Sequence, residues 1–146
     1  MSRPNLARRA LEEVCSGREL DSIEEVYSSR FVDHVNAFEY RGTDGVRRSV
    51  ALYRGLFPDL RFHVEAQVSD EQRVVSRWTL TGTHRGRPVT LWGIVISTFG
   101  DDDKIIEDWA ASDTLSLIRQ LGLWRSTLLL FTHRKLLRAQ ARADRG

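Results

Sequence analysis

The hydrophobic positions of this chain recur with a helical period in its first third and with a strand period after that. A first helix is predicted from apolar residues spaced i, i+4, i+7 and i+8, namely Ala7, Leu11, Val14 and Cys15. A second, short helix is predicted after Ser22, whose side chain can form a capping box with Glu25. The segment FVDHVN at 31–36 is predicted to be short and extended or irregular.

A third helix has the clearest boundaries. Thr43 is predicted as its N-cap, and Pro58 is predicted to stop it. The apolar residues between them share one helical face, and they are Val46, Val50, Tyr53 and Phe57.

After Pro58 the pattern alternates with a period of two. Four strands are predicted in the segments LRFHVEAQVSD, RVVSRWTLTGTH, VTLWGIVISTF and KIIEDWAAS. Short turns at 69–71, 86–88 and 100–103 separate them, which predicts an antiparallel meander. Such a sheet needs helices to cover one face, so the chain is predicted to be α+β, with a curved sheet wrapped by the N-terminal helices.

Composition fits this picture. A chain of 146 residues, with 41% hydrophobic and 29% charged residues, suits one globular domain with its own core. There is no apolar stretch of the length of a membrane span or a signal peptide, so a cytoplasmic protein is expected. The single cysteine, Cys15, fits a reducing compartment and is interpreted as a small core residue on the first helix.

The net charge of +2 is unevenly distributed. Residues 124–146 carry an excess of basic residues, and the remainder of the chain is slightly acidic. A basic tail can bind nucleic acid or an acidic membrane, but no aromatic residues are interleaved with its charges, so a solvated helix face is the preferred interpretation. The predicted organisation is an α+β domain at 1–122 and a basic amphipathic helical extension at 123–146, whose leucine stripe is expected to pack on its own domain or on a second subunit of a dimer.

Asp113 stands where the last strand pattern meets a helical pattern. Counting back in steps of two puts Asp113 and Trp109 on one face of an extended segment. A carboxylate beside apolar surface can acquire a raised pKa and carry a proton near neutral pH. The alternative is structural, because Asp113 followed by Thr114 also suits a helix N-cap.

Four segments together resemble the SnoaL-like polyketide cyclases of the nuclear transport factor 2-like superfamily. They are FVDH at 31–34, RGTDGVRRSVALYRGLFPDLRFHVE at 41–65, TLTGTHRG at 79–86 and KIIEDWAASDTLSLIRQLG at 104–122. The resemblance implies a cone-shaped curved antiparallel sheet, wrapped by helices, with one apolar pocket. It also implies a small hydrophobic, polyketide-like substrate, and neither metal nor organic cofactor.

For the chemistry, the resemblance implies that Asp113 is the general acid/base of an aldol-type ring closure. It also matches His34 to a position at the pocket mouth, where His34 or Asn36 on the same face could donate to an oxyanion. The remaining candidates for substrate binding are Tyr53, Trp78, His84, Trp92 and Trp109. For His84, a hydrogen bond from the end of its strand to the backbone is the structural alternative, and some of the tryptophans are expected to fill the core.

One departure concerns the strand before the acid. The resemblance implies a polar partner there, often histidine, but residues 94–99 offer only Ser97 and Thr98. Other activities therefore stay open: a hydratase or hydrolase, a protein that assists hydroxylation, or a binding module without catalysis. The spacing of the histidines and of Asp101–Asp103 does not predict a metal site.

Overall fold

The computed structural model describes residues 1–122, and the predicted extension at 123–146 lies outside the described residues. The chain begins with helix α1 (Arg3–Arg9), which continues as a π-helical segment, η1 (Ala10–Cys15). The predicted apolar face is largely buried, with Ala7, Leu11 and Val14 in the core. The predicted first helix is therefore confirmed, although its second half is π-helical.

The second and third helices form where predicted, but their N-caps differ. A 3₁₀ turn (η2, Leu20–Ser22) leads into α2 (Ile23–Val26), and the Ser22 hydroxyl donates to the Glu19 carbonyl oxygen instead of capping α2. Helix α3 (Gly42–Leu56) begins one residue before Thr43 and has no side-chain cap. The reason is Gly42, whose φ of +66° turns the chain directly from a strand into the helix.

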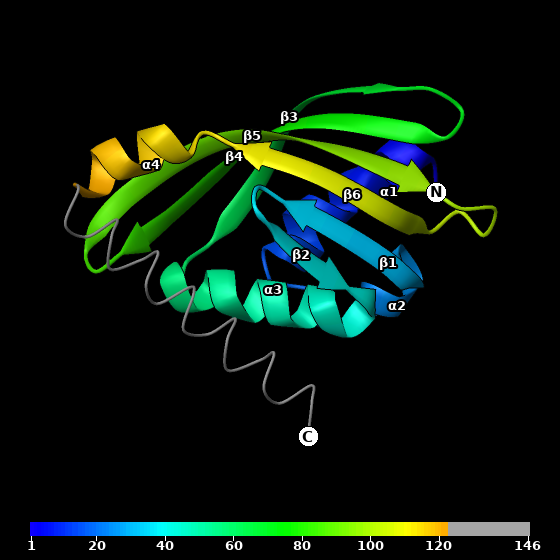
Figure 1. Cartoon of the computed structure of the whole chain (residues 1–146), viewed down its shortest axis with the longest axis horizontal. Coiled ribbons are helices and arrows are strands. Elements are labelled where there is room, and N and C mark those ends of the chain that lie inside the picture. The colour runs from blue at the N-terminus through cyan, green and yellow to red at the C-terminus, as the bar shows by residue number, and fades with distance from the viewer. Residues whose placement is uncertain (123–146) are drawn as a thin grey trace. The chain divides into compact units, whose positions relative to one another are not determined.

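Six strands form one sheet in the order β2-β1-β6-β5-β4-β3 (Figure 1). The predicted meander is confirmed as β3 (Arg61–Ser69), β4 (Arg73–His84), β5 (Arg87–Phe99) and β6 (Ile105–Ser112), joined antiparallel. FVDHVN belongs to a longer strand, β1 (Tyr27–Val35), which forms a hairpin with β2 (Phe38–Arg41). The sheet is not wholly antiparallel, because β1 pairs in parallel with β6.

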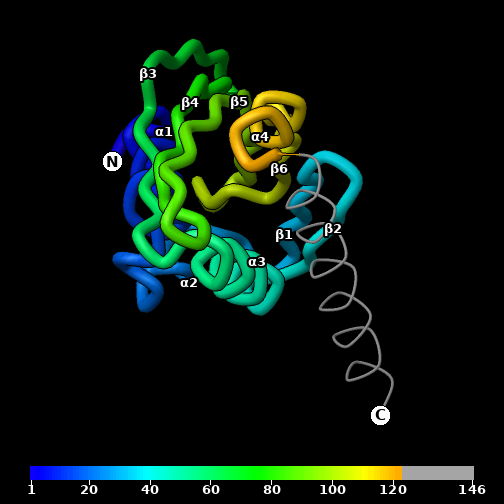
Figure 2. Tube along the Cα trace, turned by 90° about the vertical axis from the view of Figure 1, so that its left-hand side faces the viewer, coloured from blue at the N-terminus to red at the C-terminus, as the bar shows by residue number. Residues whose placement is uncertain are grey.

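The sheet curves around an interior that helices close on one side. Figure 2 shows β3 to β6 arching over this space, with α3 opposite them and β1 and β2 along one flank. The core between sheet and helices is aliphatic and aromatic, and it includes Val14, Val26, Phe31, Val74 and Ile105.

The described chain divides after Asp113 into two compact units. The first, Met1–Asp113, contains the whole sheet. The second begins with α4 (Thr114–Leu121), the helix predicted after the last strand. In the part of the chain that the structure describes, no helix has both the length and the apolar character needed to cross a membrane.

Candidate functional site

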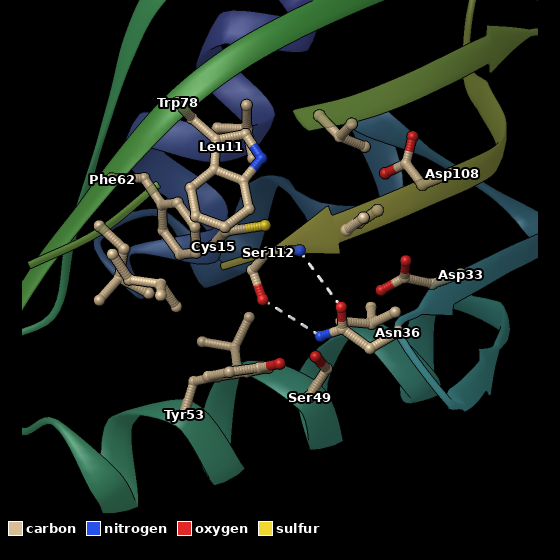
Figure 3. Close-up of a pocket in the computed structure, with 17 residues that line it drawn as sticks. Leu11, Cys15, Asp33, Asn36, Ser49, Tyr53, Phe62, Trp78, Asp108 and Ser112 are labelled. Atoms are coloured by element: carbon tan, nitrogen blue, oxygen red, sulfur yellow. Dashed lines mark hydrogen bonds between the residues drawn. The ribbon is translucent and has the colours of Figure 1, made fainter. Parts of the chain in front are cut away.

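A pocket opens between the concave face of the sheet and α3 (Figure 3). It encloses about 670 Å³ of empty space, including the part open to solvent. Most of its wall is apolar and comes from η1, α3 and the strands: Leu11, Val50, Phe62, Leu80, Leu91 and Val95. An apolar wall of this kind suits a hydrophobic small molecule and strengthens any electrostatic interaction inside it.

Two carboxylates line this pocket side by side. Asp33 on β1 and Asp108 on β6 are partners in the parallel register, so their side chains leave the sheet on the same face. Along β1 the inward positions are Phe31, Asp33 and Val35. Along β6 they continue from Asp108 to Ala110. The strand pairing therefore brings together two acids that lie far apart in the sequence.

Burial makes both acids hold protons more tightly than usual. Loss of solvation raises the pKa of Asp33 well above its ordinary value, and the neighbouring charge of Asp108 adds to this. Loss of solvation also raises the pKa of Asp108, which is only 8% exposed, while the Ser97 hydroxyl acts in the opposite direction. Ser97, predicted as a weak polar partner, is the register partner of Asp108 on β5. Because two neighbouring carboxylates do not ionise together readily, the pair retains a proton above the usual carboxyl range.

Two tyrosine side chains, Tyr40 and Tyr53, lie near enough to Asp33 to interact with its charge. Tyr40 on β2 is its register partner, and burial raises the pKa of Tyr40 to about 12. Tyr53, one of the residues predicted to bind substrate, lines the pocket from α3, and burial raises its pKa too. Both phenols therefore remain protonated donors at neutral pH.

Three buried polar atoms have no hydrogen-bond partner among residues 1–122. They are the Tyr40 hydroxyl, Trp78 Nε1 and Asp108 Oδ1. Two of them belong to side chains that line the pocket, namely Trp78 and Asp108. Buried polar groups are nearly always paired, so these two mark positions where a bound molecule can complete the hydrogen bonding.

Asn36 lines the pocket and forms hydrogen bonds to the end of β6. Its side-chain amide donates to Ser112 Oγ at 3.2 Å, and its amide oxygen accepts from the Ser112 backbone N–H at 3.2 Å (Figure 3). Its own N–H donates to the Ala110 carbonyl oxygen at 3.0 Å. Asn36 therefore lines the pocket, as predicted, while its polar atoms join the end of β1 to the end of β6.

His34 and Trp109 lie on the opposite side of the sheet from the pocket. Their rings stack with centroids 3.9 Å apart, and His34 is bracketed by Glu39 and Glu107, at 3.4 and 3.3 Å. Trp109 is 55% exposed and Trp92 is 51% exposed. The structure thus separates these three residues from the pocket in which they were expected, because the strands turn the neighbouring residues inward.

His84 and Asp113 also stand apart from the described residues that line the pocket. Nδ1 of His84 is 2.9 Å from the Leu56 carbonyl oxygen, which is the structural alternative considered for it. Asp113 follows β6 directly, and its backbone N–H donates to the Trp92 carbonyl oxygen at 3.0 Å. Of the predicted binding residues, the structure gathers Asn36, Tyr53 and Trp78 around the pocket.

Sequence reasoning missed both Asp33 and Asp108, and for Asp108 the reason is a bulge in β6. Thr98 pairs with Glu107, but Phe99 pairs with Ile105, so Ile106 is an extra residue in that strand. The bulge reverses the alternation, and both Ile105 and Asp108 are buried. A local signal did exist, since Asp33 alternates with Phe31 and Val35 within FVDHVN.

One further titratable side chain, the thiol of Cys15, lines the pocket. Burial raises the pKa of the Cys15 thiol to about 12, so little reactive thiolate is present at neutral pH. Among the described residues, no group of three or more His, Cys, Asp or Glu side chains could hold a metal ion. Asp33 and Asp108 are therefore the side chains lining the pocket whose raised pKa values suit proton exchange near neutral pH.

Comparisons with known proteins agree on a relationship. A family model described as SnoaL-like polyketide cyclase matches residues 5–121, whereas no curated protein matches the chain. A solved structure of a candidate polyketide cyclase from Bacillus cereus is 25% identical and superposes with a TM-score of 0.70, over 83% of this chain and 78% of that one.

Two proteins from Streptomyces are also similar. Wild-type IdmH from Streptomyces antibioticus, a candidate polyketide cyclase, has a TM-score of 0.73 at 21% identity, over 84% of this chain and 99% of that one. AclR from Streptomyces galilaeus, a candidate hydroxylase, has a TM-score of 0.65 at 25% identity, over 82% and 95% of the two chains.

Proposed function

The chain belongs to the SnoaL-like polyketide cyclase family, and from this we propose that it closes a ring in a small hydrophobic, polyketide-like substrate by proton transfer through Asp33 and Asp108. One observation carries the proposal: two carboxyl groups with raised pKa values lie side by side in an otherwise apolar pocket. Such a pair can hold one proton and lack another at the same pH, which a base and an acid acting in concert require.

The proposed reaction moves one proton from carbon to oxygen. An ionised carboxylate of the pair takes a proton from a carbon next to a carbonyl group, and the electron pair of that C–H bond forms an enolate. The enolate carbon attacks a second carbonyl carbon of the same molecule, which forms the new C–C bond. The resulting alkoxide then takes a proton from the carboxyl group, so the pair returns to its first state.

The two acids are suited to different parts of this cycle. Asp33 is partly exposed toward the pocket and is the better placed to reach the substrate carbon. Burial raises the pKa of both carboxyl groups, so the pair holds at least one proton near neutral pH. A neutral Asp108 next to an ionised Asp33 avoids placing two like charges together. We assign Asp33 as the proton carrier and Asp108 as the group that sets its pKa and supplies the shared proton.

Three alternatives to this assignment remain. Asp113 is the acid that the family resemblance implies, and a different substrate-bound arrangement of the end of β6 would be needed to bring it into the pocket. Hydration or assistance to hydroxylation would use the same acid pair on another substrate. The similarity to AclR, a candidate hydroxylase, is the observation that favours this alternative. A binding module would use the pocket without turnover.

The proposal can be tested with 2-tetralone, a small bicyclic ketone with an acidic C–H next to its carbonyl group. Deuterium exchange at C1, followed by NMR, reports enolisation without requiring the natural substrate. We expect wild-type protein to accelerate the exchange, and Asp33→Asn to slow the catalysed rate by at least 100-fold, because an amide cannot accept the proton. Asp108→Asn is expected to slow it less and to shift its pH dependence.

Two further variants make the test decisive. Asp101→Asn, in the exposed turn between β5 and β6, is the matched control and should retain the wild-type rate. If Asp113→Asn abolished exchange while Asp33→Asn left it intact, Asp113 would be the proton carrier and the proposed pair would be wrong. Binding of 2-tetralone without accelerated exchange would favour the binding-module reading.

A further inference from the structure

The pocket contains a hydrogen-bond donor that the proposed proton transfer does not use. Trp78 on β4 is 6% exposed, yet its Nε1 has no hydrogen-bond partner within residues 1–122. Figure 3 shows the nitrogen on the edge of the indole that is turned toward the side of the pocket that carries Asp108. An indole N–H can only donate, so the molecule that satisfies it must bring an acceptor atom.

Trp78 is held in this orientation from two sides. The Phe62 ring on β3 meets it edge to face, with centroids 5.1 Å apart. Gly93 on β5 is its register partner and lies beneath the six-membered ring of the indole. A Cβ on Gly93 would be 2.6 Å from the Ala111 carbonyl oxygen and would overlap indole carbons Cζ2 and Cη2. Glycine is therefore required for the ring to lie across β5 with its nitrogen at the pocket.

An unpaired acceptor lines the same pocket. Asp108 Oδ1 is buried and also has no partner among the described residues. The site thus offers one donor and one acceptor that are not bonded to each other. A ketone can satisfy Trp78 with its carbonyl oxygen and, under the proposed function, places its acidic neighbouring C–H near the acid pair.

We propose that the Trp78 indole N–H binds the carbonyl oxygen of the substrate, and that Gly93 is a positioning residue that keeps this donor aimed into the pocket. The inference rests on the proposed function and extends it, because the same bond would strengthen as negative charge develops on the enolate oxygen. A neutral donor in an apolar site stabilises that charge without giving up its proton. Trp78 would then determine which carbonyl of a polyketide-like chain is enolised.

Binding of two matched ligands separates the hydrogen bond from simple packing. 2-Tetralone carries the carbonyl oxygen, and tetralin has the same bicyclic shape without it. In calorimetric titrations we expect Trp78→Phe to weaken 2-tetralone binding about 3- to 10-fold, as loss of one neutral hydrogen bond implies, and to leave tetralin binding unchanged. Equal losses for both ligands would show that Trp78 contributes only packing and would overturn the proposal.

A measurement on the wild-type protein does not depend on how the variants fold. In protein with ¹⁵N-labelled tryptophan, the Trp78 Nε1–H resonance is the one missing from the spectrum of Trp78→Phe. We expect that proton to shift downfield on addition of 2-tetralone and to move much less with tetralin. Gly93→Ala should abolish the difference between the ligands because it displaces the ring.

These readouts are independent of turnover. If 2-tetralone shifts the Trp78 resonance but its deuterium exchange is not accelerated, the donor is confirmed and the proposed proton transfer fails. If exchange is accelerated and depends on Asp33, but the Trp78 resonance responds equally to both ligands, the proposed function stands and the role given to Trp78 is wrong.

Discussion

Asp33 and Asp108 oppose the stability of the fold that holds them. Each loses solvation in the pocket, and each meets the other's charge if both are ionised. In the unfolded chain the same carboxyl groups are solvated and ionise at ordinary pKa values. Their placement is therefore better explained by chemistry than by stability, as is common for buried titratable groups that line a cavity.

The linkage between pH and stability gives a residue-scale prediction. Because the folded-state pKa values are raised, the folded protein binds more protons than the unfolded chain from about pH 4 upward. Its stability should therefore be greatest at low pH within this range and should fall as pH rises through the folded-state pKa values. Asp33→Asn removes one of the two titrating groups and should weaken this fall.

Urea unfolding at several pH values measures the effect. At pH 8 we expect Asp33→Asn to exceed wild type by about 1 kcal/mol or more, since a tenfold change in proton affinity corresponds to about 1.4 kcal/mol. Near pH 4 the difference should disappear. An Asp33→Asn protein that is less stable than wild type at pH 8, with the same pH slope, would show that Asp33 is not held in a raised-pKa environment.

At the scale of elements, the parallel pairing of β1 with β6 creates the site. The two strands are separated in sequence by α3 and the antiparallel meander, and they meet in a register that places Asp33 beside Asp108. Asn36 connects β1 to β6 at the end that borders the pocket, through its hydrogen bonds to Ala110 and Ser112. The backbone of Asn36 has φ +51°, a left-handed conformation that asparagine tolerates better than most residues.

Two substitutions of Asn36 separate its side-chain bonds from its backbone conformation. Asn36→Gly keeps the left-handed turn accessible but removes the side-chain bonds, and we expect a loss of about 1–2 kcal/mol in the free energy of unfolding. Asn36→Ala should lose about 1 kcal/mol more, because alanine is strained at positive φ.

Hydrogen exchange locates the effect of these substitutions. Faster amide exchange should be confined to the end of the β1–β6 pair, including the Ser112 N–H. If both variants retained wild-type stability and wild-type protection from hydrogen exchange, the hydrogen bonds of Asn36 would not contribute to the pairing of the two strands.

At the scale of the whole molecule, the outer face of the sheet carries apolar side chains that the fold leaves exposed. Val68, Val75, Ile96, Trp109 and His34 form one row across five strands, from β3 to β1, by successive register pairs. With strands about 4.8 Å apart, the row is about 19 Å long. Ile94 and Trp92 widen it along β5. Monomeric proteins rarely expose continuous apolar surface on this scale.

We expect this face to bind a second copy of the chain. The apolar row is bordered by charges of both signs, Arg77 on β4 and Glu107 on β6, so two copies related by a two-fold axis can place opposite charges together. Ile96→Lys puts a charge at the centre of the row and should convert a dimer to a monomer in analytical ultracentrifugation. Thr81→Lys, at an exposed position of β4 away from the row, is the control.

A wild-type protein that sediments as a monomer at micromolar concentration would contradict this expectation. A dimer that Ile96→Lys leaves intact would place the contact elsewhere, for example on the predicted helix at 123–146.

Much of the local structure was predictable from the sequence because it depends on neighbouring residues. Period-two alternation identified β3 to β6, and the helical stripe of Ala7, Leu11 and Val14 identified the first helix. Position along these elements also assigned Tyr53 and Trp78 to surfaces that do line the pocket. The N-caps at Ser22 and Thr43 were predicted wrongly, because their side chains or backbones find other arrangements in the folded chain.

By itself, then, the sequence determined the α+β class, the meander and the family. Only the tertiary structure decided which acids share the pocket. The extra residue Ile106 turns Asp108 inward and Trp109 outward. The bulge forms when β6 pairs with β5, so it cannot be predicted from the local sequence pattern of β6. Likewise, Asp33 and Asp108 become neighbours only through the parallel pairing of β1 with β6. Alternation is a property of one strand, whereas register and bulges are properties of two.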